Sequence, residues 1–253
     1  TTDYGLFWLQ VGISTLVGPL LLGLFVYCLW GIAHWMGKRV WPRQDKILDR
    51  RGDRLQVLAH SGWRGLILGG LEAGYVVLFY LIATKVFGGW APVVPDYEDA
   101  FATPLPFLEA LMVGLFPAMW EELVFRLMGI AAILWFTRTY LKLPEPVCRF
   151  LALLIPGALW ACGHLTYIRE PFYLRGIELT VAAVLLAGLF FMKFDLMTTM
   201  VAHYAYNAGL TALPLLRSDD PSFVAAGLVV LATTAAPVVP GLLRAWLRKG
   251  KAA

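Results

Sequence analysis

The sequence predicts an all-α protein, a polytopic bundle of transmembrane helices that forms one membrane domain over residues 1–253. Hydrophobic residues make up 59% of the chain, and the mean hydropathy is +0.69. Charged residues make up 15% of the chain, against about 25% in a typical soluble domain. Several apolar segments also approach the ~20 residues that a helix needs to cross a bilayer.

About seven apolar segments, within a range of six to eight, are predicted to be the spanning helices. The third contains charged residues in its interior, which makes it unlike the others. The fifth and sixth are separated by residues 193–195 alone, so the chain forms either a tight hairpin or a partly re-entrant turn there. The predicted spans are 6–33, 65–87, 106–136, 150–165, 177–192, 196–213 and 223–243.

The distribution of basic residues predicts the orientation of the bundle. Sixteen of the 21 Lys and Arg residues lie in segments 34–64, 137–149 and 244–253 or at Lys193. Seven spans threaded in order place all of these on one side. Because cytoplasmic loops are enriched in Lys and Arg, this side is predicted to be cytoplasmic. The N-terminus is then outside and the C-terminus cytoplasmic, as an odd number of spans requires.

The segment 34–64 is predicted to be a basic cytoplasmic loop. Its basic residues alternate with Asp45, Asp49 and Asp53, which is typical of a solvated, partly helical linker. Binding of anionic lipid head groups or of a partner is the alternative. The net charge of +4 comes from residues that flank apolar segments, as membrane topology requires, so nucleic acid is not an expected partner.

The third predicted span carries charged residues that need partners. Glu121, Glu122 and Arg126 lie in its interior, where a charged side chain costs about 2.5–3.5 kcal/mol near the helix centre. Glu122 and Arg126 are four residues apart and share a helix face, where an ion pair lowers the cost for both. Glu121 is rotated by ~100° from Glu122 and is expected to face a cavity, water or another polar group.

The fourth and sixth predicted spans supply candidate partners for these charges. Trp160 and His164 are four residues apart, as are His203 and Asn207, so each pair shares a helix face. Polar side chains within spans usually face the bundle interior, and the three helices are therefore expected to converge on one polar pocket. A count along straight, parallel helices at about 1.5 Å per residue places His164 at the depth of Glu121 but does not place His203 there.

Three ordered motifs resemble those of a known family. Glu-Glu-x-x-x-Arg at 121–126, an aromatic-x-x-x-His at 160–164 and His-x-x-x-Asn at 203–207 follow one another on successive apolar segments. Together they resemble the CPBP (Abi) family, which includes the type II CAAX prenyl proteases and bacteriocin-processing or immunity proteins. The resemblance covers residues 107–210, which are expected to form the catalytic core. Trp160 stands where the family usually has Phe; because both are aromatic, this change is expected to affect packing more than chemistry.

The resemblance implies an intramembrane endopeptidase that cleaves a membrane-presented or lipidated peptide or protein. Glu121 would act as general base on a water that His164 helps to hold. His203 and Asn207 would donate hydrogen bonds to the oxyanion of the tetrahedral intermediate. Structural support of the site is expected from Glu122, Arg126 and Trp160.

The resemblance implies a site without a metal or other cofactor. Zinc is the alternative, because two His and one or two carboxylates can bind this ion. The sequence contains no His-Glu-x-x-His helix, however, which is a common arrangement in metalloproteases. We therefore assign no metal ligands.

Other functions remain open from the sequence. The histidines and Asn207 could be hydrogen-bonding contacts between helices, each worth about 0.6–2 kcal/mol, and the isolated acids Glu72 and Glu109 are expected to have structural or snorkelling roles. The alternative to a protease is a catalytically silent scaffold or assembly subunit with a membrane-protein partner, and a small transporter is a third reading. The expected surroundings are membrane lipids, in the inner or plasma membrane of a prokaryotic cell.

Overall fold

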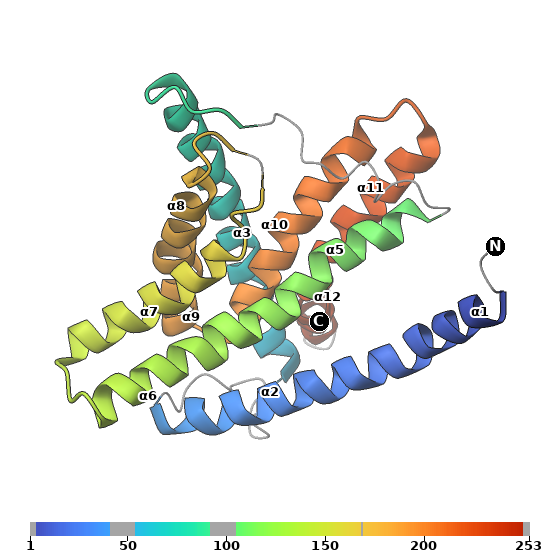
Figure 1. The fold of residues 1–253 in the computed structure, drawn as a ribbon. Helices are drawn as coiled ribbons and strands as arrows, with labels where there is room; N and C mark the ends of the chain where they lie inside the picture. Colours follow the sequence, from blue (N-terminus) through green and yellow to red (C-terminus); the bar gives the residue numbers. More distant parts are fainter. Residues whose placement is uncertain (1–3, 41–53, 92–104, 168, 250–253) are drawn as a thin grey trace.

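The computed structural model is a bundle of helices that cross one another at several angles (Figure 1). It describes residues 4–40, 54–91, 105–167 and 169–249, and no β-strand occurs in these ranges. The predicted all-α class is confirmed. The elements, in chain order, are α1 (Tyr4–Gly12), the π-helical η1 (Ile13–Val17), α2 (Gly18–Val40), α3 (Arg54–Lys85), α5 (Pro106–Glu121), the π-helical η2 (Glu122–Ile130), α6 (Ala131–Thr139), α7 (Glu145–Cys162), α8 (Leu174–Val181), the π-helical η3 (Ala182–Gly188), α9 (Leu189–Lys193), α10 (Leu196–Leu216), α11 (Pro221–Thr234) and α12 (Val239–Lys249).

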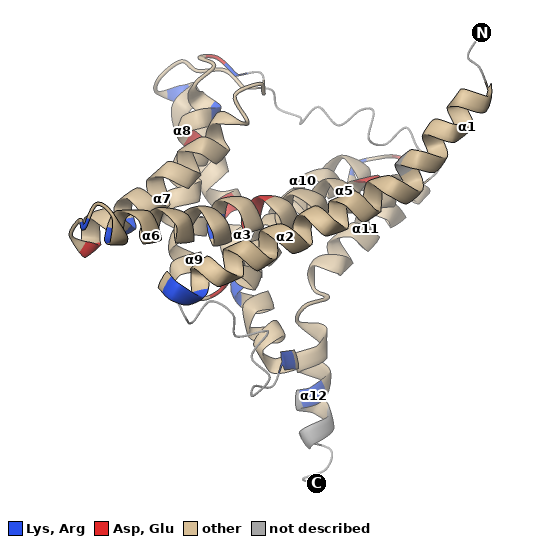
Figure 2. Ribbon diagram, turned by 60° about the horizontal axis from the view of Figure 1, so that its bottom comes forward, with Lys and Arg blue, Asp and Glu red and all other residues tan. Residues whose placement is uncertain are grey.

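Four helical stretches within the described residues are long and apolar enough to cross a membrane. They match the predicted first, second, fourth and fifth spans, and they are Tyr4–Val40, Arg54–Lys85, Glu145–Cys162 and Leu174–Lys193. The predicted third and sixth spans are also long helices, but they carry the polar residues of the motifs. Charged residues gather mainly at helix ends and connections, with a few inside the bundle (Figure 2). The count of seven spans and the orientation of the termini stay predictions.

The predicted seventh span, 223–243, is wrong as a single helix. α11 ends at Thr234, a series of turns follows, and α12 begins at Val239. Pro237 lies in this break, and a proline disfavours the helical conformation of the residue before it. Hydropathy alone does not reveal this break, because residues 235–238 are as apolar as the helices on either side.

The predicted 34–64 loop is helical at both of its ends. α2 continues to Val40 and α3 begins at Arg54, so the two flanking helices extend into this segment, and its role as a cytoplasmic loop stays a prediction. Residues 41–53, with the predicted alternation of acids and bases, lie outside the described residues.

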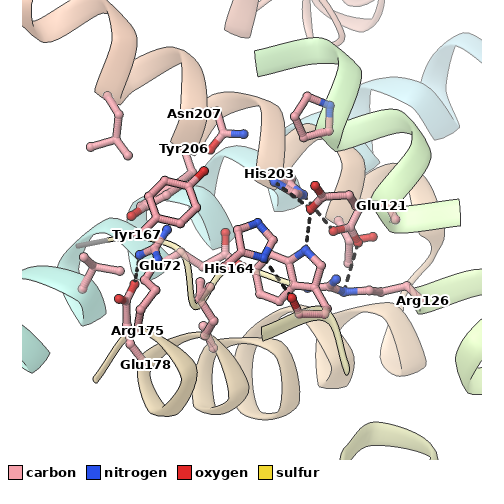
Figure 3. Close-up of a pocket in the computed structure, with 18 of the residues that line it drawn as sticks. Glu72, Glu121, Arg126, His164, Tyr167, Arg175, Glu178, His203, Tyr206 and Asn207 are labelled. Carbon is pink, nitrogen blue, oxygen red and sulfur yellow. Dashed lines mark hydrogen bonds and ion pairs between the residues drawn. The ribbon is translucent and has the colours of Figure 1, made fainter. Parts of the chain in front are cut away.

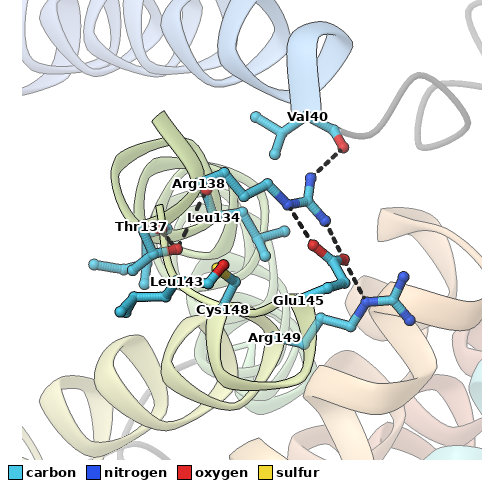
Figure 4. A network of polar contacts seen from close by, with 9 residues as sticks. Val40, Leu134, Thr137, Arg138, Leu143, Glu145, Cys148 and Arg149 are labelled. Atoms are coloured by element: carbon cyan, nitrogen blue, oxygen red, sulfur yellow. Dashed lines mark hydrogen bonds and ion pairs between the residues drawn. The ribbon is translucent and has the colours of Figure 1, made fainter. Parts of the chain in front are cut away.

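A polar network fixes the connection between α6 and α7 (Figure 4). Arg138 Nε donates to Glu145 Oε2 at 2.9 Å, and Arg149 Nε donates to Glu145 Oε1 at 2.7 Å. Arg138 Nη1 also donates to the Val40 carbonyl at 3.0 Å, which joins the end of α2 to the same point. The network therefore holds three helices together at one end of the bundle.

Asp195 makes the sharp corner between α9 and α10. Its carboxylate accepts hydrogen bonds from the backbone N–H of Thr198 at 2.8 Å and from the Ser61 hydroxyl at 2.9 Å. A side-chain oxygen at this position satisfies a backbone donor of the first helical turn. The helix therefore begins at Leu196, as the predicted sixth span does, and the corner is tied to α3 through Ser61.

Two glycines of α3 allow this helix to lie close to α10, which also contacts α5 and α11. A Cβ atom on Gly65 would lie 2.6 Å from the Val201 Cβ, and one on Gly69 would lie 3.0 Å from the Ala202 carbonyl oxygen. Gly65-x-x-x-Gly69 is the small-residue spacing that permits close helix approach in membranes. The α3–α10 contact is therefore a backbone-to-backbone approach that larger residues would prevent.

We predict that Gly65→Ala lowers the free energy of unfolding by about 1–3 kcal/mol, because overpacking forces neighbours to shift. Thermal and denaturant unfolding in detergent micelles, followed by circular dichroism, measures the change. Gly70→Ala is the matched control, since no heavy atom lies within 4 Å of a Cβ built there. Equal losses in both variants would show that close α3–α10 packing is not what Gly65 provides.

Candidate active site

Two adjacent acids lie where the α-helix α5 becomes the π-helical η2. Glu121 ends α5 and Glu122 begins η2, and their residues are 8% and 1% exposed. π-helical turns recur at functional sites because they change the direction of neighbouring side chains. Here both acids line the same cavity.

Glu122 is paired within its own helix, as predicted. Arg126 Nε lies 3.4 Å from Glu122 Oε2, with both side chains almost fully buried. This distance is that of an ion pair and is too long for a good hydrogen bond. The pair therefore neutralises charge, while Arg126 Nη1 has no hydrogen-bond partner among the described residues.

His203 joins the two acids to α10. Its Nδ1 donates to Glu122 Oε1 at 3.0 Å, and its Nε2 lies 3.9 Å from Glu121 Oε2. Figure 1 shows α5 and α10 side by side, with α6 extending well beyond the start of α10. The ends of these helices therefore do not lie at one level, and a count from the ends places His203 at the wrong depth.

Trp160 of α7 supports Glu121 directly. Its indole Nε1 donates a hydrogen bond to Glu121 Oε2, and the Arg126 guanidinium carbon lies 4.5 Å from the centroid of its ring. Phe at this position could keep the stacking but could not donate to the carboxylate. The expectation that Trp in place of Phe affects packing more than chemistry is therefore wrong.

His164 lies just beyond the end of α7, in a turn, and not in the helix that the sequence predicts for 150–165. Its Nδ1 is 2.8 Å from the Trp160 carbonyl oxygen, and its ring stacks with that of Tyr167. A carbonyl only accepts hydrogen bonds, so Nδ1 carries the proton and Nε2 is left as an acceptor in the neutral ring.

Asn207 follows His203 by one turn of α10 and lines the same cavity. Among the described residues its side-chain amide has no hydrogen-bond partner, although its backbone carbonyl accepts from Thr211. An amide NH₂ without a partner can donate to a group that enters the cavity.

All seven residues predicted for the site line one cavity of about 160 Å³ (Figure 3). The cavity lies between α3, α5, α7, α8 and α10. The predicted convergence of three polar helices is what the structure shows, and α3 and α8 add walls that the sequence did not indicate. The predicted members are Glu121, Glu122, Arg126, Trp160, His164, His203 and Asn207.

A second polar group lies on the α8 side of the cavity. Arg175 Nη1 is 2.5 Å from Glu178 Oε1, and the Tyr80 hydroxyl donates to Glu178 Oε2 at 2.6 Å. Sequence reasoning missed these residues. The signal available was Glu178 inside a predicted span with Arg175 three residues before it, a spacing that allows an ion pair on one helix face.

The arrangement of potential metal ligands does not favour zinc. Among the described residues, no group of three His, Cys, Asp or Glu side chains is placed to hold a metal ion. His203 Nδ1 is also engaged with Glu122 and His164 Nδ1 with a carbonyl. Metal-free chemistry stays a prediction.

Arg126→Met is predicted to lower the free energy of unfolding by about 3–5 kcal/mol, because it leaves the buried Glu122 charge without its ion-pair partner. Equilibrium unfolding in mixed micelles measures the loss. Arg149→Met, which removes an ion pair with exposed side chains, is the control and should cost about 0–1 kcal/mol. Similar losses from both substitutions would contradict the assignment of Arg126 as a buried neutralising partner.

Trp160→Phe and Glu121→Ala are predicted to couple in a double-mutant cycle, by about 0.5–3 kcal/mol. The physical reason is the indole-to-carboxylate hydrogen bond, which either substitution removes. Unfolding of the two single variants, the double variant and the unsubstituted chain measures the coupling. Additive losses would mean that Trp160 and Glu121 do not act on each other.

Part of the chain is similar to known proteins. Residues 103–209 match the family model described as type II CAAX prenyl endopeptidase Rce1-like. The chain is 25% identical over 152 residues, 58% of its length, to the sporulation-killing factor biosynthesis protein SkfC of Bacillus subtilis (strain 168), and the match spans 28% of that protein. No solved structure matches the chain. The family match and the helices long enough to span a bilayer indicate an integral membrane protein, and the resemblance to the CPBP family of CAAX-type proteases is confirmed.

Proposed function

We propose that this protein is an intramembrane endopeptidase of CPBP type, in which Glu121 activates a water without a metal ion. One observation carries the proposal: three separate parts of the chain bring Glu121, His164 and the pair His203 and Asn207 to one cavity. The match to a family of prenyl endopeptidases supports the same reaction class.

Glu121 is the general base in this mechanism. Its carboxylate takes a proton from a water whose oxygen attacks the carbonyl carbon of the scissile peptide bond. His164 Nε2 accepts the second hydrogen of that water, because Nδ1 is engaged with the Trp160 carbonyl. Glu121 then delivers its proton to the departing nitrogen as the carbon–nitrogen bond breaks. General-base assistance of this kind is typically worth about 10²–10⁴-fold in rate.

His203 and Asn207 stabilise the oxyanion. The Asn207 amide has no partner among the described residues and donates to the developing negative charge. His203 donates Nδ1–H to Glu122, so its Nε2 can donate as well when the ring is protonated. Glu121 and Glu122 on either side favour that imidazolium form. One oxyanion donor is typically worth about 10²–10³-fold in rate.

The substrate that we propose is a peptide or lipidated protein presented from the membrane. The cavity lies among helices that include some long and apolar enough to cross a membrane, which suits a substrate held at the membrane, and the family description names prenyl endopeptidases. The bacterial relative supports a prokaryotic inner or plasma membrane as the location.

Glu121→Gln is predicted to abolish proteolysis, with a loss of at least about 100-fold, because the amide cannot accept the proton. Purified variants in proteoliposomes are incubated with a membrane proteome, and new peptide N-termini are counted by labelling and mass spectrometry. His164→Ala should lose activity similarly. Glu109→Gln is the matched control, since Glu109 is an acid of α5 that does not line the cavity, and it should cleave like the unsubstituted chain.

Equal cleavage by all of these variants would contradict the proposal. An absence of cleavage together with a stoichiometric partner, bound equally by the unsubstituted chain and by Glu121→Gln, would identify a scaffold instead.

A further inference from the structure

Glu72 enters the cavity from α3, a helix outside the matched region 103–209. It lies three residues after Gly69 and seven after Gly65, and these spacings put all three on one helix face. The glycines bring this face against the α10 backbone. Close packing therefore turns Glu72 toward the polar residues of α10, and not toward lipid as a snorkelling residue would be.

The other charged groups on the far side of the cavity already have partners. Glu178 is fully buried, is paired with Arg175 and accepts a hydrogen bond from Tyr80. Glu122 is paired with Arg126 and His203. Each of these acids is thus neutralised by the fold itself.

Glu72 is different, because it has no hydrogen bond or ion pair among the described residues. Its carboxyl interacts electrostatically with His203, Glu122 and Arg126 at longer range. An ionised side chain within a span costs about 2.5–3.5 kcal/mol, and a carboxyl group kept there without a close partner usually marks a functional site. The side chain lines a cavity, so its missing partner can come from a bound molecule.

The charge balance of the cavity indicates which kind of molecule this is. Four carboxyl groups line it against two guanidinium groups, and a protonated His203 would still leave the carboxyl groups in excess. In a medium of low dielectric constant such an imbalance favours a cation strongly. The carboxyl groups are those of Glu72, Glu121, Glu122 and Glu178, and the guanidinium groups those of Arg126 and Arg175.

We propose that Glu72 is a specificity-determining residue that binds the ammonium or guanidinium group of a basic side chain close to the scissile bond of the substrate. The inference rests on the proposed peptidase function and adds the chemical class of the residue that the enzyme selects. Glu72 lies on α3, whereas the residues of the three motifs lie on other parts of the chain. Substrate selection and catalysis would therefore use different elements.

The experiment measures binding, so that it does not depend on turnover. The His164→Ala chain, which is expected to be inactive but keeps all four carboxyl groups of the cavity, is placed in phosphatidylcholine nanodiscs and offered two pools of N-palmitoylated dodecapeptides built from Gly, Ala, Leu, Ser and Thr. One pool carries a single Lys at each position in turn, and the other carries the uncharged analogue norleucine. We expect retention of the Lys pool at least about 10-fold above the norleucine pool, as quantified by mass spectrometry; tenfold is the ratio that about 1.4 kcal/mol of preference produces.

Adding Glu72→Gln should remove this preference, whereas adding Glu72→Asp should retain part of it and adding Glu109→Gln should leave it intact. Thermal unfolding of each variant confirms that the fold persists. Equal retention of the two pools before Glu72 is changed would overturn the proposal. So would a preference that survives Glu72→Gln, or a uniform loss of binding to both pools.

The outcomes also separate this proposal from the proposed function. If the protein prefers the Lys pool through Glu72 but shows no Glu121-dependent cleavage, the proposed binding site stands and the proposed peptidase function fails. If the protein cleaves through Glu121 but shows no preference for the Lys pool, the proposed peptidase function stands and the proposed role of Glu72 fails.

Discussion

Glu122 holds a buried negative charge between two elements, and the rest of the site depends on its contacts. Arg126, one turn along η2, provides an ion pair, and His203 of α10 donates a hydrogen bond to the other carboxylate oxygen. Charge in a bilayer interior is costly without partners. Sliding α10 along η2 would break the His203 contact and leave part of that charge unsatisfied, so the charge fixes the register of these two helices.

That register determines what the neighbouring acid can do. Glu121 is held by the indole of Trp160, and Trp160 is placed by α7, whose start is anchored through Glu145 to Arg138. A carboxylate with one donated hydrogen bond and a histidine nearby keeps acceptor capacity for water. Glu122 is therefore neutralised while Glu121 can still bind water. The two residues are adjacent in the chain, and they differ because their partners differ.

The contact between α3 and α10 depends on two glycines, which have no side chains to keep the helices apart. Gly65 and Gly69 let α3 approach α10, and Glu72 on the same face enters the cavity without a partner of its own. Glu122 and Glu178, by contrast, are neutralised internally. Glu72 is thus left at the cavity without a close partner, unlike Glu122 and Glu178.

The sequence by itself determined the all-α membrane class, the Glu122–Arg126 pair and the order of the motifs, because hydropathy and helical spacing are local properties. It could not place His203 beside the two acids, show that Trp160 donates to Glu121, or bring Glu72 into the site. These contacts join residues separated by tens of positions, and the angles at which helices cross decide them. Crossing angles follow from side-chain packing and close glycine contacts over whole helices, which only the tertiary structure shows.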